Sequence, residues 1–111
     1  MCGIVGAVAD RNVPPILMEG LQRLEYRGYD SCGIAFRYDD DIEHTRALGC
    51  AENIDKSELE HSECAIGHTR WATHGEVNLN NAHPHHSWNR DVYLVHNGVI
   101  ENSNELKKDL E

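Results

Sequence analysis

Residues 69–90 place the strictest limit on how this chain can fold. They are rich in Asn, His, Gly and Thr, show no hydrophobic period, and separate two apolar strand candidates, 64–68 and 92–96. A loop of this length is uncommon inside a compact domain, and such loops commonly carry function. We therefore expect functional side chains on it.

The residues before this loop carry strand and helix signals in alternation. Residues 3–9 are a short run with Val and Ile, which predicts a strand buried on both faces. Pro14 and Pro15 suit the first turn of a helix. Ile16, Leu17, Gly20, Leu21 and Leu24 then recur at helical spacing. This amphipathic helix should lie against the first strand.

The remaining elements are shorter. Residues 33–38 and 42–48 predict the arms of a hairpin around an acidic turn, and residues 49–63 are polar and weakly helical. Asn102 followed by Glu105 resembles a capping box and predicts a helix near the end of the sequence. That helix has no stop signal, so we expect a cut rather than a natural terminus. Residues 1–111 would then be the N-terminal part of one domain.

Composition excludes several classes of function. The formal net charge is −9 and the ten basic residues are scattered, which argues against nucleic acid because phosphates require clustered Lys and Arg. No apolar run approaches the length that spans a bilayer, and no secretory signal is present, so we expect no membrane contact. The four cysteines are far apart, which fits a reducing cytoplasm.

Cys2 is the sharpest candidate for chemistry. Its small side chain permits removal of Met1, which would leave a thiol and a free α-amine on one residue. An α-amine has a pKa of about 8, so it can accept the thiol proton directly or through water. The alternative is a small buried residue at the start of a strand.

Two further motifs can supply binding groups. Residues 68–75 include Arg70, whose guanidinium suits a carboxylate, and Trp71, which could close over a ligand. A structural Arg–carboxylate pair beside a packed Trp is the alternative. Asn97 and Gly98 can aim an amide NH2 and a backbone N–H at a developing oxyanion, although a plain Asn-Gly turn fits the same residues.

The histidines of residues 82–86 suggest a metal site at first sight. Their spacing matches no common zinc pattern and no paired thiols accompany them. We therefore expect a structural or supporting role and no metal, and we expect no other cofactor. A small metal-binding domain stays open as an alternative.

These motifs together resemble the class II glutamine amidotransferases, which are N-terminal-nucleophile hydrolases. Within them, the residues from Leu24 to Ser31 are most similar to glutamine–fructose-6-phosphate aminotransferases. The resemblance is carried by residues 2–6, 24–31, 68–75, 81–85 and 96–102. It implies an α+β fold, a four-layer α/β/β/α sandwich of which this chain supplies the N-terminal part.

The resemblance also implies a role for each matching residue. Cys2 would attack the side-chain amide of L-glutamine, with Asn97 and Gly98 forming the oxyanion hole. Arg70 would hold the substrate carboxylate. The remaining substrate-binding residues implied by the family are Trp71, Thr73, His74, Arg27 and Gly28.

For the parent protein, the resemblance implies a homo-oligomer that transfers ammonia from glutamine to fructose 6-phosphate to make glucosamine 6-phosphate. Binding of fructose 6-phosphate would belong to C-terminal sugar-isomerase domains outside these residues. The alternative is a truncated, inactive fragment or an interaction module that keeps the motifs but not the whole fold.

Overall fold

The computed structural model describes residues 2–27, 30–71, 76–98 and 100–111. Short 3₁₀ helices connect the main elements at Glu25–Arg27, Ala51–Asn53, Lys56–Glu58 and Leu79–Asn81. The main elements in chain order are β1 (Gly3–Val8), α1 (Pro14–Arg23), β2 (Ser31–Tyr38), β3 (Asp41–Leu48), β4 (Cys64–Arg70), β5 (His85–His86), β6 (Tyr93–Leu94) and α2 (Ser103–Leu110).

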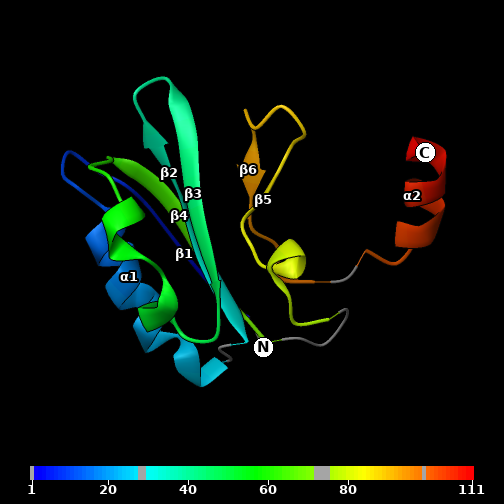
Figure 1. The fold of residues 1–111 in the computed structure, drawn as a ribbon, viewed down its shortest axis with the longest axis horizontal. Coiled ribbons are helices and arrows are strands. Elements are labelled where there is room, and N and C mark those ends of the chain that lie inside the picture. Colours follow the sequence, from blue (N-terminus) through cyan, green and yellow to red (C-terminus); the bar gives the residue numbers. More distant parts are fainter. Residues whose placement is uncertain (1, 28–29, 72–75, 99) are drawn as a thin grey trace.

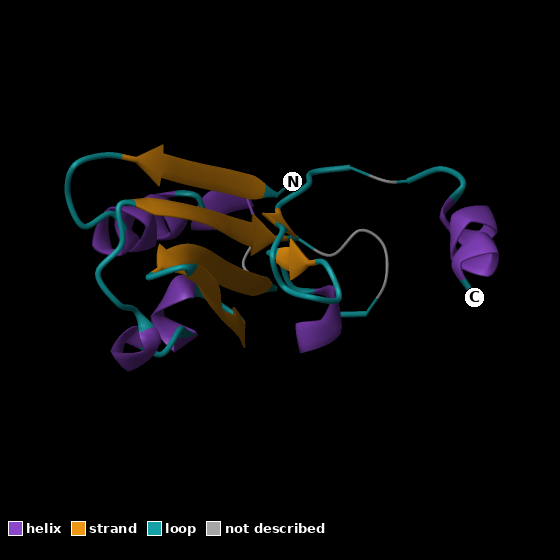
Figure 2. Ribbon diagram, turned by 90° about the horizontal axis from the view of Figure 1, so that it is seen from above, coloured by secondary structure: helices purple, strands orange, loops and turns teal. Residues whose placement is uncertain are grey.

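The first four strands form one antiparallel sheet in the order β1-β4-β2-β3. Strands β5 and β6 form a separate antiparallel pair. Helix α1 packs on one face of the sheet, and the β5–β6 pair lies on the other side (Figures 1 and 2). Helix, sheet and second sheet therefore follow one another in the order expected for an α/β/β/α sandwich.

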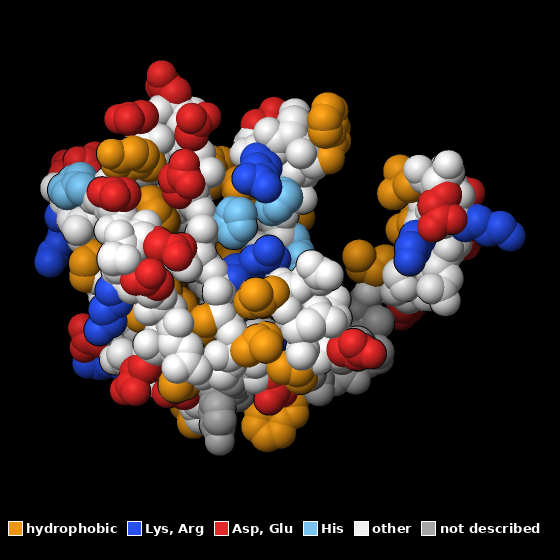
Figure 3. All heavy atoms as spheres, in the orientation of Figure 1, with side chains coloured by type: hydrophobic (Ala, Val, Ile, Leu, Met, Phe, Trp, Pro, Cys, Tyr) orange, Lys and Arg blue, Asp and Glu red, His pale blue; other side chains and the backbone are white. Residues whose placement is uncertain are grey.

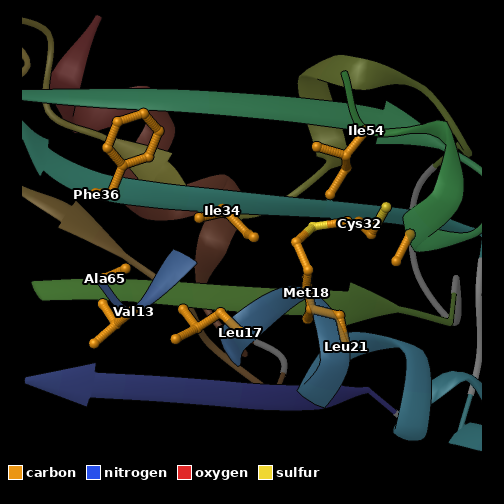
Figure 4. Close-up of a cluster of buried hydrophobic side chains, with 10 residues drawn as sticks. Val13, Leu17, Met18, Leu21, Cys32, Ile34, Phe36, Ile54 and Ala65 are labelled. Atoms are coloured by element: carbon orange, nitrogen blue, oxygen red, sulfur yellow. The ribbon is translucent and has the colours of Figure 1, made fainter. Parts of the chain in front are cut away.

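The apolar core lies between α1 and the sheet. The helix starts at Pro14 and Pro15 as predicted, because a missing N–H does no harm in the first turn. It buries Leu17, Met18 and Leu21, whereas Ile16 points away from this face and is 41% exposed. Val13, just before the helix, joins them, and the sheet and the segment after β3 contribute the other side chains of the core (Figure 4), which are Cys32, Ile34, Phe36, Ala51, Ile54 and Ala65.

The prediction that the first strand is buried on both faces was wrong. Among the strands that the structure describes, β1 pairs only with β4 and forms an edge of the sheet, and its residues alternate in burial. Val5 and Ala7 face the core, while Ile4 is 44% and Val8 82% exposed. A run of apolar residues in the sequence does not show whether both faces of the strand are covered by other elements.

The β5–β6 pair is seated closely on the sheet at Gly33. A Cβ built on Gly33 would lie 2.1 Å from the carbonyl oxygen of His83 and 3.0 Å from Cδ of Pro84. Only glycine permits that approach. Polar contacts flank it, since Arg46 Nη1 donates to the carbonyl of Ala82 at 3.2 Å. The long polar loop is therefore partly ordered against β2 and β3.

Helix α2 is present where Asn102 and Glu105 predicted it, but the capping box is not formed. Asn102 is the N-cap residue and its side chain makes no capping hydrogen bond. Every residue of α2 is exposed, and Figure 1 shows the helix apart from the sheet. Within the described residues, no helix has both the length and the apolar character to cross a bilayer.

Candidate active site

Cys2 lies directly before β1 and beside the end of β4. Gly3 pairs with Thr69 in the antiparallel ladder, so Cys2 comes next to Arg70 and Trp71. The Cys2 thiol donates to the carbonyl oxygen of Trp71, with Sγ 3.7 Å from that oxygen. The residue is half-buried. The strand pairing thus joins the first and the second predicted motif.

Asn97 reaches the same place from the other end of the sequence. Its Nδ2 donates to the carbonyl oxygen of Cys2 at 3.0 Å. Its Oδ1 lies 2.8 Å from Nε2 of His68, a fully buried side chain on β4. The Asn97 side chain therefore makes tertiary contacts on both sides, which an ordinary Asn-Gly turn would not require.

Gly98 follows at a bend of the backbone. A Cβ at this position would come within 2.9 Å of the imidazole of His96. Because the His96 side chain is exposed and can move, the constraint is milder than at Gly33. The backbone N–H of Gly98 follows the Asn97 amide in the chain, and its part in an oxyanion hole stays a prediction.

Arg70 is the last residue of β4, and Trp71 follows it in the chain. The Arg70 side chain is 7% exposed, and among its contacts Nη1 donates to the carbonyl oxygen of Glu76 at 2.8 Å. Trp71 is 50% exposed, as expected for a residue that could cover a ligand.

The other predicted site residues cannot be placed in full. Thr73, His74 and Gly28 lie outside the described residues. Arg27 ends the 3₁₀ helix Glu25–Arg27, which contacts β4, and its side chain is not described.

A stack of histidines that the motifs did not assign to the site lies behind Asn97. The rings of His68 and His83 are stacked with centroids 4.0 Å apart and planes 24° from parallel, and His85 follows at 4.3 Å from His83. Figure 3 shows histidine side chains gathered where the β5–β6 pair meets the sheet. His83 Nδ1 accepts from the backbone N–H of His96 at 3.4 Å.

Burial keeps these imidazoles neutral. It lowers the pKa of His68 to about 4, against the opposing effect of the Asn97 hydrogen bond. Burial also lowers the pKa of His83 to about 3, and the neighbouring His68 and His85 add to the effect. Among the residues that the structure describes, no group of three or more His, Cys, Asp or Glu side chains could hold a metal ion.

Sequence reasoning named His68 only as the first residue of a motif. The signal that could have identified it is alternation along a strand, because His68 and Arg70 must point to the same face. That face is the one opposite α1, which the β5–β6 pair covers. The sequence alone does not show that Asn97 lies within hydrogen-bond distance of His68.

Comparison with known proteins places this geometry in a family. Residues 28–110 match the family model described as class-II glutamine amidotransferases. The glutamine–fructose-6-phosphate aminotransferase [isomerizing] of Acinetobacter baylyi is 55% identical to the chain, covering 100% of it. The enzyme of the same name from Pseudomonas putida is 50% identical over 99% of the chain. The chain spans only 18% of each of these relatives.

Solved structures agree with the fold. The glutamine phosphoribosylpyrophosphate amidotransferase from B. subtilis, complexed with ADP and GMP, superposes with a TM-score of 0.80 at 26% identity. It covers 99% of this chain, which matches 24% of that structure. A structure described as the allosteric regulatory enzyme of purine biosynthesis gives 0.74 at 28% identity, covering 98% of this chain and 24% of its own. The predicted fold class is confirmed.

Proposed function

We propose, from the premise that the chain belongs to the class II glutamine amidotransferases, that residues 1–111 form the N-terminal part of a glutamine-hydrolysing domain with Cys2 as its nucleophile. The observation that carries the proposal is the position of Asn97. Its amide NH2 is directed at the backbone of Cys2 although the two residues are 95 positions apart in sequence. An amide donor bonded to the backbone of the proposed nucleophile is suitably located to contribute to an oxyanion hole.

In the proposed reaction the Cys2 thiolate attacks the side-chain amide carbon of L-glutamine. Loss of Met1 would free the α-amine, which takes the thiol proton and then returns it to the leaving nitrogen. Ammonia departs and leaves a thioester on Cys2, which water hydrolyses to glutamate. Groups accelerate this attack when they interact more strongly with the transition state than with the bound glutamine.

Asn97 and Gly98 would stabilise the negative charge that develops on the amide oxygen of glutamine. One hydrogen of the Asn97 NH2 is bonded to the carbonyl of Cys2, and an amide NH2 has a second hydrogen available for a substrate oxygen. The backbone N–H of Gly98 would be the other donor. Losing a donor of this kind costs about 10²–10³-fold in kcat in other acyl-transfer enzymes.

Substrate binding is assigned to the residues around the end of β4. Arg70 would hold the α-carboxylate through its guanidinium group, and Trp71 would cover the bound glutamine. The proposal gives Thr73, His74, Arg27 and Gly28 the supporting contacts that the family resemblance implies. The buried position of the Arg70 side chain supports this assignment, because an Arg–carboxylate pair strengthens away from water.

For the whole protein we propose transfer of the released ammonia to fructose 6-phosphate, giving glucosamine 6-phosphate. The support is the name of the two relatives above, each matched over 18% of its length. The sugar would bind to residues beyond those described here. We also propose a homo-oligomer acting in the cytoplasm, where thiols such as Cys2 and Cys64 stay reduced.

The proposal is tested by comparing Cys2→Ala with Cys64→Ala in the full-length protein that contains this chain. Cys64 is equally half-buried but pairs with Val8 at the far end of β1. Release of glutamate from glutamine should be lost in Cys2→Ala and retained in Cys64→Ala. Intact-mass measurement of the wild-type protein should show that Met1 is absent. Unchanged activity in Cys2→Ala, or a retained Met1 in active protein, would reject the mechanism.

A further inference from the structure

We infer that His68 is a positioning residue for the Asn97 side chain, holding its amide so that the NH2 group faces Cys2. The inference rests on the proposed function and adds a residue to it that touches neither the nucleophile nor the proposed substrate pocket. It is carried by the contacts on the two sides of the Asn97 amide and by the confinement of the His68 ring.

The hydrogen-bond partners fix the direction of the Asn97 amide. The backbone carbonyl of Cys2 can only accept, so the Asn97 atom facing it at 3.0 Å must be the NH2 nitrogen. Oδ1 is then the atom 2.8 Å from His68 Nε2, which must carry a hydrogen. A flipped amide would set its oxygen against the oxygen of Cys2.

The other ring nitrogen of His68 agrees with this tautomer. Nδ1 is buried and has no hydrogen-bond partner among the described residues. A hydrogen placed there would be a buried, unpaired donor, which is rarer and costlier than an unpaired acceptor. The tautomer with hydrogen on Nε2 therefore suits both ends of the ring. It offers Asn97 a donor and nothing else.

The His68 ring has no freedom to turn away. The residue is 0% exposed and lies on β4, which is paired on both sides with β1 and β2. Its ring is stacked against His83, whose Nδ1 accepts the backbone N–H of His96. His83 thus holds the backbone before Asn97 while His68 holds the side chain. The two stacked imidazoles make a two-point support for the proposed oxyanion donor.

The charge of the surroundings preserves this support. Burial is the largest cause of the lowered pKa of His68, and the nearby His85 and Arg70 act in the same direction. The ring consequently stays neutral through the physiological range. Nε2 carries hydrogen in the neutral tautomer assigned above, so the contact with Asn97 is constant over that range.

The experiment compares His68→Gln with His68→Asn in the full-length protein. The terminal amide of Gln reaches about as far as histidine Nε2 and can donate to Asn97, whereas that of Asn ends about where Nδ1 lies. We expect kcat for glutamine hydrolysis to fall about 10–100-fold in His68→Asn, with KM changed less than about 3-fold. His68→Gln should recover kcat to within about 3-fold of the wild type.

Combination with Asn97→Ala provides the second measurement. If His68 acts through Asn97, His68→Asn should cause no further loss of kcat in the Asn97→Ala background. The folded fraction of each variant, measured by circular dichroism, corrects its kcat for unfolded protein. His68→Met, which matches the length of the side chain without a donor, replaces His68→Asn if that variant does not fold.

Three results would overturn the inference. These are wild-type kcat in His68→Asn or His68→Met, equal losses in the Gln and Asn variants, and losses that multiply with that of Asn97→Ala. Cys2→Ala serves as the reference in the same assay. Activity that survives Cys2→Ala rejects the proposed function itself, so the two failures are distinguishable.

Discussion

The two faces of the four-stranded sheet are held by different forces. The face toward α1 is packed with aliphatic and aromatic side chains, among them Leu17, Ile34 and Phe36. The opposite face meets the β5–β6 pair through hydrogen bonds and stacked rings, such as those of His68 with Asn97 and His83. Apolar burial is non-directional, while hydrogen bonds have a direction. The first face stabilises the fold, and the second aligns the candidate site.

The magnitudes support this division. Full burial of one large apolar side chain contributes about 1.5–3 kcal/mol to the free energy of unfolding, whereas a typical hydrogen bond contributes about 0.5–1.5 kcal/mol. Substitutions on the apolar face should therefore change stability most. Those on the polar face should change stability less and activity more.

The largest effect on stability is expected from Phe36→Ala, which would empty a site that is 1% exposed. The free energy of unfolding should fall by about 3–5 kcal/mol, because the removed ring leaves a cavity. Urea unfolding of the chain measures it. Tyr38→Ala, on the same strand at 40% exposure, is the control and should lose clearly less. Equal losses would contradict the difference between buried and exposed positions.

The second prediction concerns how the free energy of unfolding changes with pH, and it involves the polar face of the sheet. Unfolded histidine has a pKa of about 6.5, and that of His68 in the folded chain is about 4. Between these values the unfolded chain binds more protons, so the free energy of unfolding falls as the pH is lowered. The slope is about 1.4 kcal/mol per pH unit for this residue, and the contribution is constant above about pH 6.5.

His68→Gln removes that titration and should flatten the curve. Unfolding of both proteins from about pH 7 to about pH 4.5 gives the difference in slope. His61→Gln, at an exposed position, is the control and should follow the wild type. Parallel curves for wild type and His68→Gln would show that His68 takes up its proton normally in the folded chain.

A smaller loss in the free energy of unfolding is expected from Gly33→Ala. Gly33 lies where the segment with His83 and Pro84 packs on the sheet. The added Cβ must displace the carbonyl of His83, and such overpacking costs about 1–3 kcal/mol. Gly6→Ala on β1 is the matched control, because a Cβ there would meet only contacts of 3.8 Å. Glutamine hydrolysis should fall in Gly33→Ala alone. Normal activity in Gly33→Ala would mean that the close approach of His83 to Gly33 is not needed to position Asn97.

The smallest effect is expected from Tyr93→Phe. It removes the hydroxyl that lies 3.0 Å from Nδ1 of His44 and leaves the ring in its tilted contact with His86. We expect a loss of about 1 kcal/mol in the free energy of unfolding. Tyr38→Phe, at a residue that is 40% exposed, is the control. A loss above that of Gly33→Ala would reverse the order proposed for the polar face.

Local signals predicted the elements that depend on local physics. Pro14 and Pro15 with Leu17 and Leu21 identified α1, because helix starts and apolar spacing are encoded within a few residues. The hairpin of β2 and β3 followed from its acidic turn. The burial of β1 was predicted wrongly, since the position of a strand within a sheet is not a local property.

The residues of the candidate site could be proposed from the sequence, but their arrangement could not. Cys2, Arg70 and Asn97 were recognised from their motifs, and the pairing of Gly3 with Thr69 could not be read from either segment. The role inferred for His68 depends on a contact across 29 positions. Asn102 shows the opposite failure, because a local capping pattern is present and its hydrogen bond is not formed.

The contact between Cys2 and Asn97 also sets an order of events during synthesis. The two residues are 95 positions apart, and a ribosome adds roughly 5–20 residues per second, so the second emerges roughly 5–20 s after the first. During that interval the N-terminal residue is available for processing while the amide that will face it does not yet exist. Under the proposed function, removal of Met1 could therefore begin before Asn97 is present to contact Cys2.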